Sequence, residues 1–182
     1  YFFNFRIIHI SSDGVFGTNS GICDESKFCD ADDVYGISKR LGEVNSPHVL
    51  NIRTSIIGPS PIKQKGLLEW FLSHPRNSQI SGYSNQQWNG VTTLQFSKLC
   101  KILILDDYFS TVIDESSIHH FCPNNNINKY ELLKLFSYYI RPDIKIAEEV
   151  NPNYAISRIL ATRYKTINAK YGINFTTLIV AN

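Results

Sequence analysis

The sequence predicts an α/β fold with a mostly parallel sheet. Two observations support this prediction. Residues 5–10 and 49–57 are short runs rich in Ile and Val, and their continuous apolar character suits strands buried on both faces. Stretches with apolar residues at helical spacing alternate with such runs along the chain, and strand–helix alternation is typical of parallel sheets.

The first expected strand, residues 5–10, ends at a Ser-Ser-Asp-Gly turn, and residues 17–32 have the composition of a loop. A helix capped by Asp32 or Asp33 is then expected to run to about Val44. Its apolar residues are spaced three, four and three apart, which predicts a stripe facing the core. These residues are Val34, Ile37, Leu41 and Val44.

The later part of the chain keeps the alternation. Further helices are expected at residues 66–74, 93–105, 128–140 and 156–165, and further strands at residues 79–83, 118–122 and 144–150. Asn128 and Glu131 have the spacing of a capping box.

Composition excludes several function classes. The 182 residues are 43% hydrophobic, which suits a packed core, and the net charge of +2 argues against a basic face for nucleic acid. No apolar run approaches the roughly 18 residues of a membrane span. The four cysteines form no CxxC pair, so we expect reduced thiols and a cytoplasmic protein. The chain has no methionine and starts at Tyr1 without a leader, so we expect it to be the C-terminal part of a longer protein.

Ser12, Tyr35 and Lys39 are the residues most informative about chemistry. Tyr35 and Lys39 are four residues apart on the expected helix and therefore share a face. A lysine ammonium near a phenol favours the tyrosinate form, and such a tyrosine can exchange a proton with an alcohol or carbonyl oxygen. Ser12 follows the first strand, at the sheet edge where open α/β folds bind ligands.

Two other patterns have an ordinary structural interpretation. A second Tyr-x-x-x-Lys pair, Tyr130 and Lys134, belongs to an amphipathic helix with no serine-tipped strand before it. His119 and His120 are adjacent on an expected strand, so they point to opposite faces, and no further ligand stands at suitable spacing. We therefore predict no metal site.

Three segments in order, ISSDGVFGTNSG, DADDVYGISKRLGEV and VLNIRTSIIG, resemble the extended short-chain dehydrogenase/reductases. The resemblance is to the dTDP-4-dehydrorhamnose reductase branch, a group of sugar-nucleotide reductases. That family has a strand ending in Ser-Thr-Asp-x-Val-Phe, a Tyr-Gly-x-x-Lys helix ending in Gly-Glu, and a strand bearing Arg-Thr-Ser. The match is dense over residues 7–58 and looser to about residue 165.

The resemblance implies a doubly wound, Rossmann-type parallel sheet that binds NADP or NAD, with a small α/β cap for a sugar nucleotide. Residues 1–60 would be the C-terminal part of the dinucleotide-binding domain. Residues 61–182 would be mainly the cap, with a segment near 117–122 returning to the sheet. The family's glycine-rich cofactor turn is missing from this chain, so we expect it upstream and expect negligible NAD(P)H affinity and poor solubility of these residues alone.

Carried over residue by residue, the resemblance implies that Ser12, Tyr35 and Lys39 are catalytic. Tyr35 would be the acid, and Lys39 would also hold the cofactor ribose. Thr54 and Ser55 fall where the family's chain passes the nicotinamide, so the expected cofactor-binding set is Tyr35, Lys39, Thr54 and Ser55.

Two departures leave the substrate open. Gly14 stands where rhamnose-forming reductases usually have a substrate-facing aromatic residue, and Ile56 stands where they often have Trp.

The expected substrate contacts are Ser12, Asp13, Arg53 and Trp88. Two interpretations of Trp88 stay open, because this side chain either stacks on a base or sugar or belongs to a core or an interface. Arg53 either meets a phosphate or is a structural ion-pair partner.

The expected activity is NAD(P)H-dependent reduction of a nucleoside-diphospho 4-keto-6-deoxysugar in deoxysugar or polysaccharide biosynthesis. The expected partner is the nucleotide sugar, with no nucleic acid and no membrane, and a homodimer is left open. One alternative is an epimerase or dehydratase of the same superfamily. Dehydratases of this type add an acid pair beside the Ser/Thr, whereas Asp13 supplies one carboxylate. The other alternative is a regulatory subunit resembling the β subunit of methionine adenosyltransferase, against which the intact Ser12, Tyr35 and Lys39 set argues.

Overall fold

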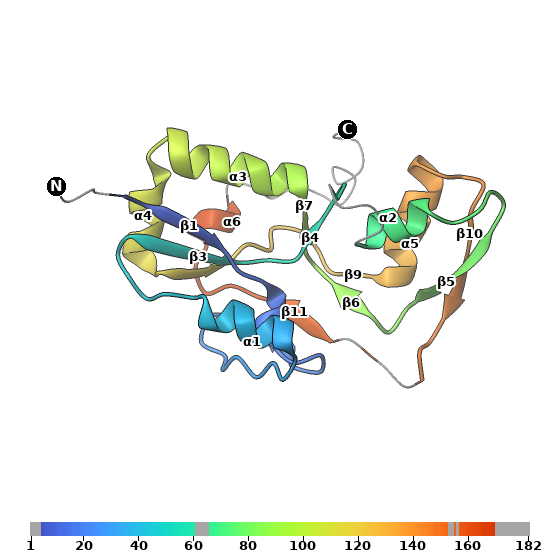
Figure 1. The fold of residues 1–182 in the computed structure, drawn as a ribbon, viewed down its shortest axis with the longest axis horizontal. Coiled ribbons are helices and arrows are strands. Elements are labelled where there is room, and N and C mark those ends of the chain that lie inside the picture. The colour runs from blue at the N-terminus through green and yellow to red at the C-terminus, as the bar shows by residue number, and fades with distance from the viewer. Residues whose placement is uncertain (1–4, 61–65, 153–154, 156, 170–182) are drawn as a thin grey trace.

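A computed structural model describes residues 5–60, 66–152, 155 and 157–169 (Figure 1). The strands in chain order are β1 (Ile7–Ile10), β2 (Gly21–Cys23), β3 (Val49–Arg53), β4 (Ile56–Ile57), β5 (Gln79–Tyr83), β6 (Gln87–Trp88), β7 (Val91–Thr92), β8 (Ile118–His120), β9 (Ile127–Asn128), β10 (Lys145–Glu149) and β11 (Arg158–Leu160). The helices are the 3-10 helix η1 (Asp13–Val15), α1 (Val34–Leu41), α2 (Leu67–Leu72), α3 (Thr93–Leu105), α4 (Tyr108–Glu115), α5 (Lys129–Tyr139) and α6 (Thr166–Ala169).

The α/β class with mostly parallel strands is confirmed. Across the described residues, β6 and β9 form the only antiparallel pair of named strands, and the other paired strands run parallel. A three-stranded sheet has the order β1-β3-β8, and a second parallel pair joins β10 to β5 in the part of the molecule that includes α2 and α5. Figure 1 shows these two groups of elements side by side, joined by β4, β7 and β6.

The three-stranded sheet has a well-buried centre. Every residue of β3 is buried, and Leu50 and Ile52 pack in one cluster with residues of α3 and α4. β1 pairs with β3 alone among the described strands, and Ile7 and Ile10 are 42% and 44% exposed. The expectation that residues 5–10 are buried on both faces is therefore wrong, because β1 lies at the edge of this sheet.

Several expected elements are confirmed closely. The helix expected at residues 93–105 and the strand expected at 79–83 are α3 and β5. Asp33 caps α1, since its side chain accepts a hydrogen bond from the Gly36 amide at 2.9 Å. The capping box also forms, with the Glu131 amide donating to Asn128 at 2.8 Å.

Three sequence expectations about elements are wrong. The helix expected at residues 156–165 is replaced by β11, and α6 begins only at Thr166. The loop expected at 17–32 contains β2. These two strands of three residues pair with each other, and neither carries the long apolar run that would predict a strand. The strand expected at 49–57 is divided into β3 and β4, because β3 ends at Arg53. The chain then leaves the three-stranded sheet, and β4 pairs with β7 instead.

Three of the four residues in the apolar stripe expected to face the core are exposed, and the fourth, Ile37, is half-buried. Val34, Leu41 and Val44 are 86%, 74% and 51% exposed, whereas Gly36 is the buried residue of the helix. The helix packs on η1 through its glycine face, because only a residue without a side chain allows that close contact. The direction predicted for the stripe is therefore wrong.

No helix within the described ranges is long and apolar enough to cross a membrane. The division of the chain at residue 60 into two domains stays a prediction.

Candidate active site

The end of β1 brings Ser12 and Asp13 to the carboxyl edge of the sheet. Ser12 is the N-cap of η1, and its Oγ accepts a hydrogen bond from the Gly14 amide at 3.0 Å. The same hydroxyl lies 3.1 Å from Asp13 Oδ1, to which it donates. These two contacts orient the hydroxyl of Ser12, a buried residue.

The first turns of α1 bring Tyr35 and Lys39 to the same edge. The Tyr35 ring lies against Gly14, since a Cβ atom at Gly14 would be 2.9 Å from Tyr35 Cε1. The Lys39 ammonium donates to the carbonyl oxygen of Ile10 at 3.2 Å and lies 5.9 Å from the centre of the Tyr35 ring. A side chain at position 14 would displace the Tyr35 ring, so the close approach of Tyr35 requires glycine at this position.

A cavity of about 290 Å³ brings the three expected catalytic residues together. Ser12, Tyr35 and Lys39 all line it. Thr54 and Ser55, the two residues expected beside the nicotinamide, line the same cavity. The Thr54 hydroxyl is anchored, because it donates to the carbonyl oxygen of Phe121 at 2.8 Å. We call this space the first cavity.

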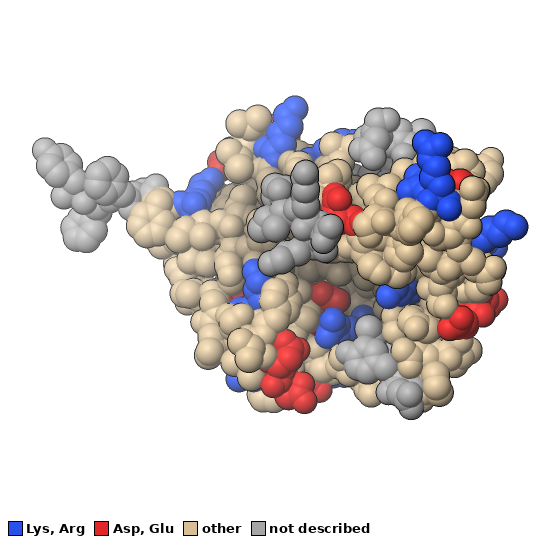
Figure 2. All heavy atoms as spheres, turned by 45° about the vertical axis from the view of Figure 1, so that its right-hand side comes forward, with Lys and Arg blue, Asp and Glu red and all other residues tan. Residues whose placement is uncertain are grey.

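A second cavity, of about 300 Å³, adjoins the first. The two cavities share Asp13, Ser55, Ile56 and Arg158 as lining residues. Trp88 lines the second cavity, and its indole Nε1 donates to Ser55 Oγ at 2.8 Å, which fixes the ring beside the shared wall. Figure 2 shows a hollow in the middle of one face of the molecule, with acidic and basic side chains within it.

Arg158 is a cavity residue that sequence reasoning missed. Its Nε atom lies 3.4 Å from Asp13 Oδ2, and its Nη1 donates to the carbonyl oxygen of Phe16 at 3.2 Å. Arg158 belongs to β11, which the sequence predicted as part of a helix. The parallel pairing of β11 with β2 brings it to Asp13, and no local pattern in the sequence signals a contact across that separation.

Arg53 has a structural role in place of the expected substrate contact. Its Nε and Nη2 atoms donate to the two carboxylate oxygens of Glu43 at 2.8 and 2.7 Å, and both side chains are about 5% exposed. Arg53 lines neither cavity. The prediction that Arg53 meets substrate is therefore wrong, and the ion-pair alternative describes this residue.

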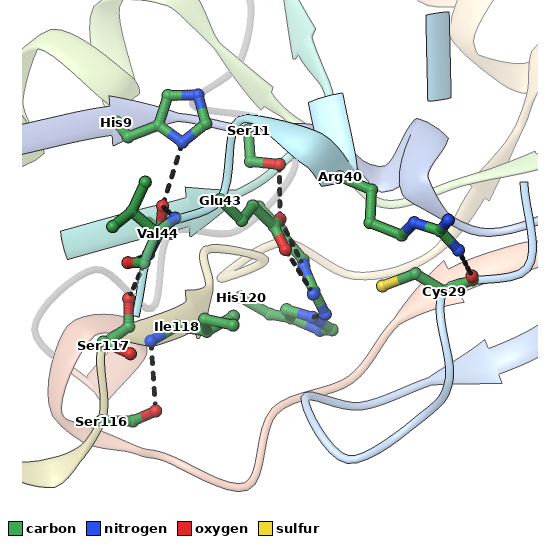
Figure 3. A network of polar contacts seen from close by, with 12 residues as sticks. His9, Ser11, Cys29, Arg40, Glu43, Val44, Ser116, Ser117, Ile118 and His120 are labelled. Carbon is green, nitrogen blue, oxygen red and sulfur yellow. Dashed lines mark hydrogen bonds and ion pairs between the residues drawn. The ribbon is translucent and has the colours of Figure 1, made fainter. Parts of the chain in front are cut away.

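The Glu43 carboxylate also supports the active-site edge. It accepts a hydrogen bond from Ser11 Oγ at 2.6 Å, next to Ser12 in the chain (Figure 3). Burial alone would raise the pKa of Glu43, but the hydrogen bonds from Arg53 and Ser11 hold that pKa below its usual value. The carboxylate is therefore ionised at neutral pH and holds the end of β1 against β3.

His120 extends this network as a neutral imidazole. Its Nδ1 donates to the carbonyl oxygen of Ala161 at 2.8 Å, and its Nε2 faces Arg53 Nη1 at 3.4 Å. Nε2 therefore accepts, and burial lowers the pKa of His120, which agrees with a neutral ring. Figure 3 shows His120 below the Glu43 carboxylate. Across the residues that the structure describes, no group of three or more His, Cys, Asp or Glu side chains could hold a metal ion.

Replacing Gly36 by alanine is expected to destabilise the fold. The added Cβ would lie 2.2 Å from the carbonyl oxygen of Gly14 and 2.4 Å from Ala31 Cβ, so α1 and η1 must separate. We expect a loss of about 1–3 kcal/mol in the free energy of unfolding, measured by urea denaturation. Gly42→Ala, at the C-cap of the same helix, is the control, because the nearest atoms to its Cβ would be those of the His9 ring at 3.2 Å. Equal effects of the two changes would contradict the close contact.

No protein-family model matches the chain, and no curated protein matches it. Solved structures do match. A dTDP-4-dehydrorhamnose reductase from Bacillus anthracis, in complex with NADP, superposes with a TM-score of 0.67 at 16% identity over 93% of this chain and 60% of that one. The enzyme of the same name from Yersinia enterocolitica gives 0.64 at 18% identity, over 89% and 59% of the two chains. The chain has the fold of these reductases.

Enzymes of other activities share the same fold. A dTDP-glucose 4,6-dehydratase from Streptomyces venezuelae, with NAD bound, gives a TM-score of 0.61 at 15% identity over 97% of this chain and 58% of that one. The chain therefore spans less than two thirds of each of the three proteins. The resemblance to the reductase branch that the sequence predicts is confirmed in fold, and the fold is shared by NAD(P)-dependent reductases and dehydratases that act on sugar nucleotides.

Proposed function

We propose that the protein reduces the keto group of a nucleoside-diphospho 4-keto-6-deoxysugar with NADPH or NADH, in deoxysugar biosynthesis in the cytoplasm. The observation that carries this proposal is that Ser12, Tyr35 and Lys39 line one cavity. These are a hydroxyl donor, a phenolic acid and a cation, which together are the groups that protonation of a developing alkoxide requires. An adjoining cavity beside Trp88 offers room for the rest of a nucleotide sugar.

The residues of the first cavity have distinct tasks in this proposal. The Gly14 amide donates to Ser12 Oγ and holds it in place, and the single Ser12 proton turns from Asp13 Oδ1 to donate a hydrogen bond to the keto oxygen. The Tyr35 phenol donates its proton to the same oxygen as negative charge develops there. The Lys39 ammonium, held on the Ile10 carbonyl, stabilises the phenolate that remains.

The nicotinamide cofactor, when bound, supplies the hydride that reaches the keto carbon. The first cavity fits its nicotinamide and ribose end, because Tyr35, Lys39, Thr54 and Ser55 form one polar wall there. Lys39 offers N–H donors to the ribose hydroxyls. The given sequence contains no glycine-rich turn for the pyrophosphate, so the proposed fit concerns the nicotinamide and ribose end alone.

One observation favours a reductase over a dehydratase. Of the residues described around the two cavities, Asp13 is the only one with a carboxylate, and its Oδ2 faces Arg158. A dehydratase needs an acid and a base beside the keto sugar in addition to the tyrosine. The lining of this site offers no such pair.

The complete gene product, incubated with NADPH or NADH and a set of 4-keto-6-deoxy sugar nucleotides, tests the proposal. We expect the absorbance of the reduced cofactor to fall in proportion to the alcohol formed. Conversion of the sugar without net consumption of cofactor would instead indicate an epimerase. An inactive protein that tightly binds another protein would indicate the regulatory alternative, and either result would overturn the reductase proposal.

A further inference from the structure

Lys129 brings an ammonium group to the second cavity, at a position where a positive charge is energetically unfavourable. It is the first residue of α5, it is half-buried, and it lines the second cavity but not the first. The amino end of a helix carries a partial positive charge, which disfavours a cation there. Burial also lowers the pKa of Lys129, because an ammonium loses hydration at this place.

Nothing described in the fold supplies the opposite charge. The ion pairs in the described part of the chain involve other residues, and none includes Lys129. Its Nζ instead lies 5.5 Å from the centre of the Trp70 ring and 5.6 Å from that of Tyr83. Two aromatic faces hold a cation in position without neutralising its charge. The side chain is therefore fixed at the cavity with its charge uncompensated.

The two cavities place Lys129 at a defined point along a ligand. Arg158 lines both cavities and lies at their junction, where Asp13 at 3.4 Å offsets its charge. Lys129 lies beyond that junction, on a wall that also contains the apolar side chains of Leu67 and Leu132. A molecule whose keto carbon lies beside Ser12 therefore reaches Lys129 only with a group attached on the far side of its sugar.

We propose that Lys129 is a specificity-determining residue that selects ligands carrying a diphosphate, by donating a hydrogen bond to a phosphate oxygen in the second cavity. An ammonium with no carboxylate partner among the described residues, beside a partly apolar cavity, suits a nucleoside diphosphate, whose phosphates supply the missing charge and whose base packs on the apolar wall. This inference rests on the proposed function, because it uses the same site for the nucleotide end of the substrate.

The test compares dTDP with thymidine, which lacks the phosphates, by calorimetric titration of the complete gene product. The variant Lys129→Met keeps the aliphatic stem between the two rings and removes the charge. We expect Lys129→Met to weaken dTDP binding about tenfold or more and to change thymidine binding less than about twofold. Lys134→Met is the matched control, because Lys134 lies on the same helix over the Tyr130 ring and lines neither cavity.

The outcomes separate this inference from the proposed function. Unchanged dTDP affinity in Lys129→Met would overturn the role of Lys129 while leaving the cavity as a nucleotide site. Equal binding of dTDP and thymidine by the unaltered protein would also overturn it, because no diphosphate would then be selected. The reduction of keto sugar nucleotides is scored independently by the cofactor assay, so a protein that reduces these sugars keeps its function in either case.

Discussion

Tyr35→Phe is expected to reduce turnover of the keto sugar nucleotide about 10²- to 10⁴-fold, the contribution of a positioned general acid. The change removes one hydroxyl and keeps the ring that packs on Gly14, so the fold and the cavity wall remain. Ser12 would still polarise the keto oxygen, but no group at that place could donate the proton. We expect KM to change only a few-fold, since the loss falls on the transition state. Turnover is measured from the oxidation of NADPH or NADH.

The second Tyr-x-x-x-Lys pair supplies a matched control. Lys134 Nζ lies 5.2 Å from the centre of the Tyr130 ring, close to the 5.9 Å between Lys39 and Tyr35. Tyr130 lines neither cavity, so Tyr130→Phe should leave turnover within about twofold. A Tyr35→Phe enzyme that works as fast as Tyr130→Phe would show that Tyr35 is not the acid.

Glu43→Gln is expected to lower the free energy of unfolding by about 3–5 kcal/mol, the cost of removing one partner of a buried ion pair. The Arg53 guanidinium would remain buried at 4% exposure with no anion bonded to it. Ser11 would also lose a carboxylate acceptor at 2.6 Å. Urea denaturation followed by circular dichroism measures the change. A loss below 1 kcal/mol would contradict the structural role assigned to Arg53.

Asp107→Asn is the control for this ion pair. Asp107 pairs with Arg6 at the surface, where the two side chains are 75% and 47% exposed. Asparagine also tolerates the left-handed backbone that Asp107 adopts, with φ of 50°. A surface pair contributes about 0–1 kcal/mol, so the difference between the two variants isolates the effect of burial.

The sequence predicted the catalytic edge because its signals are local. The apolar strand before Ser12, the Asp33 cap of α1 and the four-residue spacing of Tyr35 and Lys39 can each be recognised within a few residues. The structure brings Ser12, Tyr35 and Lys39 to one cavity, and Thr54 and Ser55, which the sequence placed beside the nicotinamide, line the same cavity. The catalytic roles of these residues stay predictions until turnover is measured.

What the sequence failed to predict depends on long-range pairing. Arg158 lies in a three-residue strand whose partner, β2, is far away in the chain, so its position beside Asp13 has no local signature. The role of Arg53 was ambiguous because a buried ion pair and a phosphate contact use the same guanidinium. The apolar stripe on α1 faces outward because the helix packs on η1 through Gly36. The close backbone contact at this glycine, and not the burial of apolar area, decides which face of α1 packs.

The pairing of β11 with β2 also bears on how the protein is made. The ribosome releases β2, the end of β1 and α1 early, whereas Arg158 follows more than 130 residues after Gly21, its register partner. The wall shared by the two cavities therefore cannot close until nearly all of the described chain has emerged. Contacts between residues so far apart in sequence form slowly, so we expect the active site to mature late in folding.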